Sequence, residues 1–178
     1  TLVVIAEWKG LVTASNKPVD SPLTLITSSQ RRNNPQYLDS KIHHNNLLNN
    51  IIAKIESNLA GADDAVMLDS EGFVSETNAT NIFMVKDGEV FTPIANGTFL
   101  AGITRARHIS NLSEAGLKVH QKVLSFQDFE EADEIFMSGN MNKVTPVTAF
   151  EDRQYQVGPI AQKARSLYWD WAATAGRP

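Results

Sequence analysis

The 178-residue sequence contains no cysteine, which excludes disulfides, thiolate nucleophiles and metal sites built from cysteine. It also lacks an apolar run long enough to cross a membrane. With a net charge of −4, it offers no excess of basic residues for nucleic acid or anionic lipid. We therefore expect neither a nucleic-acid nor a membrane partner. The absence of cysteine fits a reducing compartment, so we expect a cytoplasmic location.

The residues that are present are typical of a globular protein. Hydrophobic residues make up 42% and charged residues 20% of the chain, and its length suits one domain with a sizeable core. The sequence contains no internal repeat and no linker. It opens with Thr1 inside an apolar, β-branched run rather than with Met, so we expect residues 1–178 to be part of a larger protein.

Hydrophobic periodicity predicts an α+β fold with strands and helices mixed along the chain. Apolar or alternating runs predict strands at residues 2–8, 23–28, 65–69, 73–77, 81–86, 89–93, 117–124, 133–139 and 143–150. Spacings near 3.6 residues predict helices at about 45–61, 102–116, 125–132 and 159–176. Turn signals at 70–72 and 86–88 indicate hairpins, so we expect a mixed, largely antiparallel sheet with flanking helices.

Two of the predicted helices carry apolar residues on one face. In the helix at 45–61 these are Leu47, Leu48, Ile51, Ile52, Ile55 and Leu59, with Gly61 where the helix should stop. This spacing predicts an amphipathic helix. In the helix at 102–116 we expect Ile103, Ile109 and Leu112 to face the core.

The stretch LDSKIHHNN at residues 38–46 precedes the first helix and contains the first candidate for chemistry. Adjacent histidines point in different directions, so His43 and His44 do not form a metal site and we expect no metal. Lys41 would lie near the positive end of the helix dipole, and this field with partial burial would lower the pKa of its amine. A Schiff-base nucleophile needs such an amine, although Lys41 alone is more simply a surface lysine in a polar loop.

The second candidate is Glu76 in the predicted strand at 73–77. Strand alternation places Glu76 on the same face as Val74, which predicts that the carboxylate points inward. A buried carboxylate is costly unless it meets a cation or hydrogen-bond donors, and Asn78, Thr80 and Asn81 could supply the donors. The alternatives are a charge on an edge strand and an acid held inward to pair with a protonated ligand nitrogen.

Two further segments are suited to an anion. In FLAGITRAR, residues 99–107, Gly102 leads into a helix start whose Ile103 and Thr104 offer backbone N–H groups, a hydroxyl and the helix dipole. In FMSGNMNKVTPV, residues 136–147, a strand ends in Ser138, Gly139 and Asn140, a compact polar turn. Taken singly, these are an ordinary helix start and an ordinary β-turn.

Taken in order, these features resemble the fold-type IV pyridoxal phosphate enzymes, which include branched-chain aminotransferases, D-amino-acid aminotransferases and aminodeoxychorismate lyase. The resemblance extends from SSQRRN to VTPV, and SETNATNIF, GITR and ADEIFMSG are its most specific parts. It implies the large domain of the D-amino-acid aminotransferase-like fold, with a pseudo-barrel sheet. Residues 1–178 would be this cofactor-binding domain, and the family's small N-terminal domain would be missing from the chain.

The resemblance also implies the cofactor pyridoxal 5′-phosphate and a role for each candidate. Lys41 would form the Schiff base with the cofactor and then move a proton between it and the substrate Cα. Glu76 would keep the pyridine nitrogen protonated. The remaining residues would surround the rest of the cofactor: Gly102, Ile103 and Thr104 at the phosphate, Gly139 and Asn140 on its other side, and Leu100 on the ring face.

The chain departs from the family pattern in two places. Branched-chain enzymes typically read Lys-x-Gly-Gly-Asn-Tyr, whereas histidines replace the glycines here and no aromatic residue follows Asn45. The usual Thr of Ser-Gly-Thr is Asn140. Both changes put a branched-chain substrate in doubt but leave the cofactor in place.

Three functions are compatible with these residues. The first is a homodimeric aminotransferase that acts on an amino acid or primary amine and a 2-keto acid. The second is a lyase that uses the same cofactor and releases pyruvate without an acceptor. The third is a non-catalytic domain that keeps the fold, against which the retention of both Lys41 and Glu76 argues.

Overall fold

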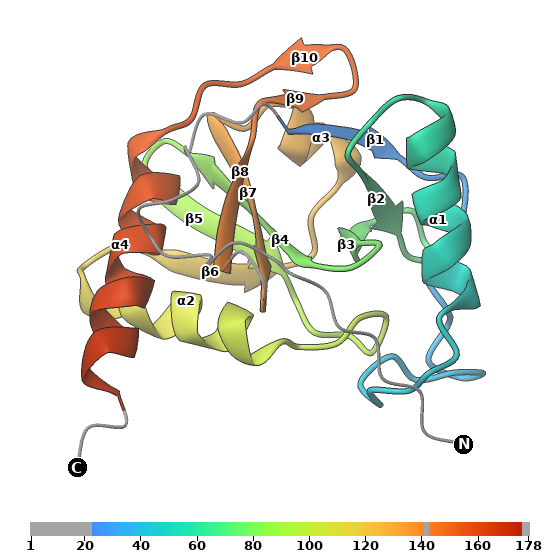
Figure 1. Ribbon diagram of the computed structural model, residues 1–178, viewed down its shortest axis with the longest axis horizontal. Coiled ribbons are helices and arrows are strands. Elements are labelled where there is room, and N and C mark those ends of the chain that lie inside the picture. The colour runs from blue at the N-terminus through green and yellow to red at the C-terminus, as the bar shows by residue number, and fades with distance from the viewer. Residues whose placement is uncertain (1–22, 141–142, 176–178) are drawn as a thin grey trace, which may run out of the picture.

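The structure is a computed structural model that describes residues 23–140 and 143–175, so the strand predicted at 2–8 lies outside the described residues. The other predicted elements are present, and the strands form two five-stranded sheets in the orders β10-β9-β1-β2-β3 and β6-β5-β4-β7-β8 (Figure 1). The strands are β1 (Thr24–Thr27), β2 (Asp64–Leu68), β3 (Val74–Thr77), β4 (Asn81–Lys86), β5 (Glu89–Pro93), β6 (Val119–Lys122), β7 (Glu134–Gly139), β8 (Lys143–Val147), β9 (Ala149–Phe150) and β10 (Arg153–Gln154). The helices are α1 (Leu48–Leu59), α2 (Ile103–Glu114), α3 (Phe126–Glu130) and α4 (Pro159–Thr174).

The predicted α+β fold class is confirmed, with the strands divided between two mixed sheets. The pairs β9–β10, β2–β3, β4–β5, β4–β7 and β7–β8 are antiparallel, whereas β1–β2, β1–β9 and β5–β6 are parallel. Helix α1 packs against β2 on one side of the molecule, and α2 and α4 lie together on the other side (Figure 1). None of the helices in the described part of the chain is both long and apolar enough to cross a membrane.

The chain passes from one sheet to the other between β3 and β4, and this crossing builds the candidate site. Consecutive strands would normally pair as a hairpin, but β3 pairs with β2 and β4 pairs with β5 and β7. Apolar side chains of both sheets meet in one buried core that includes Val66, Val74, Ile82 and Ile135. The end of β3 is therefore held against the start of β4 at the seam between the sheets.

Local signals in the sequence set several boundaries. Ser125 caps α3, and its side chain and that of Asp128 form a reciprocal capping box. Gly61, just after α1, has a φ of 73°, a left-handed conformation that glycine adopts without steric cost. In the β4–β5 hairpin, Asp87 and Gly88 have φ values of 51° and 75°, which is the pattern of a type I′ turn.

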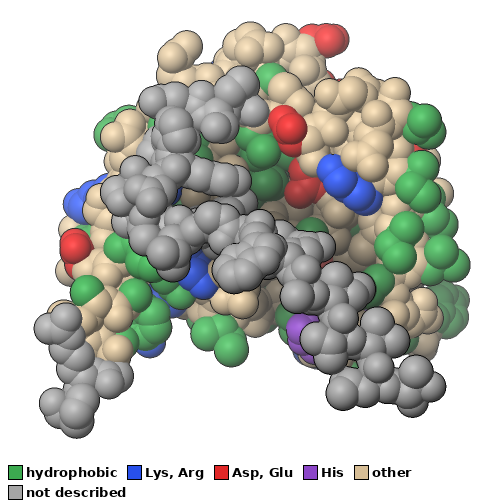
Figure 2. Space-filling view, in the orientation of Figure 1, with side chains coloured by type: hydrophobic (Ala, Val, Ile, Leu, Met, Phe, Trp, Pro, Cys, Tyr) green, Lys and Arg blue, Asp and Glu red, His purple; other side chains and the backbone are tan. Residues whose placement is uncertain are grey.

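The apolar stripe of α1 does not face the core. Small residues, Ala53 and Ser57, are the buried ones on this helix. Figure 2 shows hydrophobic side chains along the edge of the molecule where α1 lies. The large apolar residues that are exposed on this helix or at its N-cap are Leu47, Leu48, Ile51, Ile55 and Leu59. The helix is amphipathic as predicted, but its contact with β2 is made through small side chains, so the large ones remain at the surface.

Helix α2 follows its prediction at two of three positions. Leu112 is fully buried and Ile109 packs against the core that surrounds it. Ile103 is 89% exposed, so the expectation that it faces the core is wrong. It is the first residue of the helix, and the inward positions of α2 begin with Thr104 and Arg105, which are buried.

Candidate functional site

The carboxylate of Glu76 is buried and holds an ion pair inside the protein. Its side chain is 8% exposed, and Oε1 lies 3.0 Å from Nη2 of Arg32, whose side chain is 5% exposed. Oε2 accepts a hydrogen bond of 3.0 Å from Nδ2 of Asn81. The predicted inward orientation of Glu76 is therefore present, and of the three predicted donors only Asn81 bonds it. Burial raises the pKa of Glu76 to about 8, while the positive charge of Arg32 lowers it.

Arg32 ties the acid to the loop that carries Lys41. Its Nη2 also donates to Oγ of Ser40 at 3.1 Å, and its Nε donates to the backbone oxygen of Thr98 at 2.8 Å. The backbone N–H of Ser40 in turn donates to the oxygen of Gly97 at 3.2 Å. A single buried guanidinium therefore fixes the acid, the residue before Lys41 and the loop after β5 relative to one another.

Lys41 lies in a turn rather than at the mouth of a helix. Helix α1 begins at Leu48, seven residues later, so the predicted position of Lys41 beside the helix dipole is wrong. The Lys41 side chain is 62% exposed, and its Nζ lies 3.6 Å from Oδ2 of Asp39. A Cβ atom built on Gly97, which has a φ of 95°, would lie 3.5 Å from Cε of Lys41. The lysine stem therefore runs directly over the Gly97 backbone.

Helix α2 begins with an open end that points to an anion site. Gly102 is its N-cap residue, and no side chain among the described residues caps the helix. The N–H groups of the first turn, including those of Ile103 and Thr104, have no partner within the helix. Thr104 is 8% exposed, whereas the exposed side chain of Ile103 leaves only its backbone to contribute. This end offers donors and a positive dipole, as the sequence predicted.

Asn81, at the start of β4, connects the acid with the start of α2. Besides Glu76, its Nδ2 donates to the backbone oxygen of Leu100 at 2.9 Å, and its Oδ1 accepts from the N–H of Gly102 at 3.2 Å. A Cβ atom at Gly102 would lie 2.6 Å from Oδ1 of Asn81, so this close approach requires glycine. Three of the predicted site residues thus form hydrogen bonds with the side-chain amide of Asn81, namely Glu76, Leu100 and Gly102.

The end of β7 and the turn that follows it lie beside Asn81 and the start of β4. In the β4–β7 ladder, Asn81 is the direct partner of Ser138. Oγ of Ser138 is buried and finds no hydrogen-bond partner in the described part of the protein. A Cβ atom at Gly139 would meet Cγ2 of Thr80 at 2.8 Å. Asn140 is exposed, and its backbone and side-chain oxygens accept hydrogen bonds from Nζ of Lys143.

The sequence patterns described above do not identify Arg32 as a site residue, although it lies beside Glu76 in the structure. A signal was available, because a single inward acid requires a cation or several donors, and two adjacent arginines precede Lys41 within the same segment. The resemblance instead implies that a ligand nitrogen supplies this cation. The structure contains a cation of its own, so the acid is paired even without a ligand.

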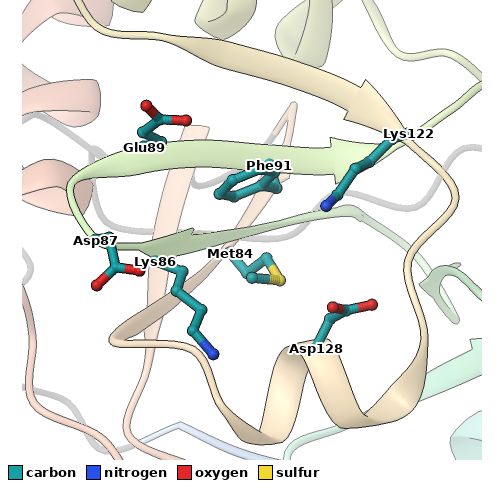
Figure 3. A pocket seen from close by; sticks show the side chains of 7 residues that line it. All are labelled: Met84, Lys86, Asp87, Glu89, Phe91, Lys122 and Asp128. Atoms are coloured by element: carbon teal, nitrogen blue, oxygen red, sulfur yellow. The ribbon is translucent and has the colours of Figure 1, made fainter.

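The hollow drawn in Figure 3 lies elsewhere and has a volume of about 330 Å³. It is lined by β4, β5, β6 and α3, namely by Met84, Lys86, Asp87, Glu89, Phe91, Lys122 and Asp128. Most of its charged groups are engaged in contacts at the surface of the sheet, for example Lys86 with Glu131 and Glu89 with Lys118. It includes none of the predicted site residues, so the connected residues around Glu76 remain the candidate site.

Known proteins resemble the chain over most of its length. It is 46% identical to the branched-chain-amino-acid aminotransferase-like protein 2 of Arabidopsis thaliana, over 100% of this chain and 32% of that protein. A Brucella abortus aminotransferase bound to the cofactor PLP has 43% identity and a TM-score of 0.83, over 88% of this chain and 57% of that one. A branched-chain aminotransferase of Thermoproteus uzoniensis, solved with norvaline, has 30% identity and a TM-score of 0.84, over 88% and 53%.

The chain thus spans about a third of the length of this plant relative and somewhat more than half of these two solved proteins. Both structural matches have high TM-scores at identities of 30% or more, and they agree with the two-sheet arrangement described above. The family model described as amino-transferase class IV matches residues 3–150, which is most of the sequence. The chain belongs to the class IV aminotransferase family.

Proposed function

We propose that residues 1–178 are the cofactor-binding large domain of a pyridoxal-phosphate-dependent aminotransferase, which moves an amino group between an amino acid or primary amine and a 2-keto acid. The observation that carries this proposal is the connected set of contacts at the seam between the sheets. A buried acid, Glu76, is linked through Arg32 to the loop of Lys41 and through Asn81 to the open start of α2. These are the three groups that an aldehyde, a pyridine nitrogen and a phosphate require.

The residues present fit this cofactor at both of its charged ends. Glu76 is buried, and its pKa of about 8 lies near neutral pH. Such a carboxyl suits a ring nitrogen, because the two groups can share one proton. An uncapped helix start suits a phosphate. The buried hydroxyl of Ser138, near the end of β7, finds no partner among the described residues and adds a donor to the same region.

Pyridoxal phosphate, when bound, supplies an electron sink for the bonds at the substrate Cα. In the proposed site, Nζ of Lys41 would hold the cofactor covalently and would carry the proton to and from the substrate Cα. Glu76 would hold the proton at the ring nitrogen, and Arg32 keeps that acid in place. Leu100 would lie against the ring face.

The phosphate would lie between two chain segments. The N–H groups of Ile103 and Thr104 and the Thr104 hydroxyl would donate to it from the start of α2, to which Gly102 leads. Gly139 and Asn140 would lie on its other side. The exposed Ile103 side chain does not conflict with this role, since the backbone donates.

We further infer a cytoplasmic homodimer as the assembled protein. The apolar stripe of α1 is an argument for a second subunit, because Leu48 and Leu59 are 63% and 84% exposed. The other side of the same helix packs on β2. The lack of cysteine fits a reducing compartment. The substrates are an amino donor and a keto-acid acceptor. The names of the relatives favour transamination over the lyase reaction, which uses no acceptor.

The first test uses the full-length protein without substitutions. It is mixed with pyridoxal phosphate, its visible spectrum is recorded, and it is reduced with borohydride and cleaved for peptide mapping. We expect a visible absorption band and a reduced label on Lys41. A label on Lys143, the lysine beside Asn140, would refute the assignment of Lys41. A band without any transfer from amino acids or amines to 2-keto acids would favour the lyase.

Replacing Thr104 tests the phosphate end. Thr104→Val keeps the shape of the side chain but removes the hydroxyl, so we expect pyridoxal phosphate to bind more weakly by about 1.5–3 kcal/mol, roughly 10- to 150-fold. Calorimetric titration of the apoprotein measures this affinity. Thr92→Val is the matched control, since the buried Thr92 hydroxyl donates to the backbone oxygen of Ile82 at 2.9 Å. The control should lower stability and leave the affinity unchanged; an unchanged affinity in Thr104→Val would contradict the phosphate site.

A further inference from the structure

Asn81 makes three hydrogen bonds, all to groups at the proposed site. Its side chain is on β4 and the residue is 7% exposed. The amide donates to Glu76 and to the oxygen of Leu100, and it accepts from the N–H of Gly102. Both donor positions and one of two acceptor positions are therefore used. None of the three partners lies on β4 itself.

These partners leave only one orientation for the amide. If the oxygen and nitrogen were exchanged, the oxygen would face the carbonyl of Leu100, another acceptor. The nitrogen would then face the N–H of Gly102, another donor. A flipped amide would lose both of these bonds whether Glu76 is ionised or protonated, so the contacts themselves assign the orientation.

The three partners belong to different parts of the cofactor site. Glu76 is on β3 and would meet the ring nitrogen, Leu100 would contact the ring face, and Gly102 begins the helix that would meet the phosphate. The Asn81 bond to Gly102 leaves the N–H groups of Ile103 and Thr104 free of side-chain caps. The asparagine thus holds the helix start in place without occupying its anion-binding donors.

We propose that Asn81 is a positioning residue, which sets the distance and orientation between the acid for the ring nitrogen and the helix end for the phosphate. This inference rests on the proposed cofactor. Because one rigid amide contacts both ends, binding at one end is coupled to the geometry of the other. A purely structural asparagine would stabilise the fold without affecting ligands.

The test compares three ligands on the apoprotein: pyridoxal phosphate, pyridoxal without phosphate, and inorganic phosphate alone. Affinities are measured by calorimetric titration of the full-length protein. Glu76→Gln should weaken pyridoxal but not phosphate, and Thr104→Val should weaken phosphate but not pyridoxal. Asn81→Leu should weaken both, and we expect pyridoxal phosphate to bind roughly 10- to 100-fold more weakly. A loss of affinity for both pyridoxal and phosphate distinguishes a residue that positions both ends of the cofactor site from a residue that acts at only one end.

A second substitution keeps the test informative if Asn81→Leu fails to fold. Asn81→Asp retains an oxygen for the N–H of Gly102 but loses the donors and places a second carboxylate beside Glu76. It should keep most of the phosphate affinity and lose the pyridoxal affinity. Asn111→Leu is the matched control, because Asn111 is a buried asparagine on α2 whose amide donates to the backbone oxygen of Leu167 at 3.2 Å. It should lower thermal stability and leave all three affinities unchanged.

The outcomes are separable from those of the proposed function. If the wild-type protein binds no pyridoxal phosphate, the proposed function fails. If the wild type binds it and both Asn81 variants bind pyridoxal and phosphate as tightly as the wild type, only the positioning role fails. A set of affinities in the Asn81 variants that matches Asn111→Leu would likewise assign Asn81 a structural role and overturn the inference.

Discussion

Lys41→Ala should remove the covalent attachment of pyridoxal phosphate altogether, so that borohydride no longer labels the protein. The amine is the group that would both form the bond and carry the proton. Losing the proton transfer alone should slow transamination by about 10²–10⁴-fold. The substitution should leave the fold intact, because the Lys41 side chain is 62% exposed and its nearest charge is Asp39 at 3.6 Å. Single-turnover assays with labelled amino donor measure the rate in the full-length protein.

Two controls make this result specific. Lys163→Ala removes an exposed lysine of α4 and should retain both the label and the rate. Lys143→Ala removes the lysine that contacts Asn140, and it should alter affinity at most. If Lys41→Ala kept a reducible band and near-normal transfer, the assignment of Lys41 would be wrong. If the label moved to Lys143 while transfer continued, the chemistry would belong to that lysine.

The sequence predicted the elements of the fold well because their signals are local. Ser125 and Asp128 form a capping box from residues three apart, and the Asp87–Gly88 turn depends on two neighbouring φ angles. The inward orientation of Glu76 followed from the two-residue period of a strand. Each of these features is decided by groups that are close in the chain, so a single sequence contains the information.

The error at Ile103 concerns the first turn of α2, and the others concern the start and the environment of α1. Asn45 and Asn46 do not join the helix, because asparagine is a poor helix former and its side chain competes for the backbone. Lys41 is in a turn, seven residues before the first residue of α1. The exposure of Leu59 and Ile55 could not be predicted either, since it depends on which side of the helix meets β2.

The site was predicted in part. The residues named by resemblance gather around one seam, but the contacts that connect them are long-range. Arg32 lies 44 positions before Glu76, and Gly102 lies 21 positions after Asn81. A loop arginine and a strand asparagine carry no local signal that marks them as partners. Only the crossing of the chain between the two sheets brings them together.

Arg32→Met should destabilise the apoprotein by an amount that grows with pH. Burial raises the pKa of Glu76 from 4.5 in the unfolded chain to about 8 in the folded protein. The stability contributed by a raised pKa is complete below 4.5 and is lost as the pH rises through 8. Without the charge of Arg32 the folded pKa is higher still, so the variant continues to lose stability where the wild type has levelled off. The difference opens above pH 8 and grows by at most about 1.4 kcal/mol for each further pH unit, so a difference of about 1 kcal/mol is expected at pH 9.

Urea unfolding at pH 6 and pH 9 measures this difference. Arg105→Met is the matched control, because Arg105 is also buried but its guanidinium donates to the backbone oxygen of Pro93 and to Gln121 rather than to an acid. Its loss of stability should be the same at both pH values. The double variant Arg32→Met/Glu76→Gln should regain stability at pH 9, since no buried carboxylate remains to ionise. Equal losses for Arg32→Met at pH 6 and pH 9 would show that the Arg32–Glu76 pair contributes no charge interaction, and the acid would then be neutral throughout this range. The pH at which the wild type and Arg32→Met diverge is the pH at which Glu76 ionises in the apoprotein. The ionised carboxylate is the form of Glu76 that would pair with a protonated ring nitrogen in the proposed site.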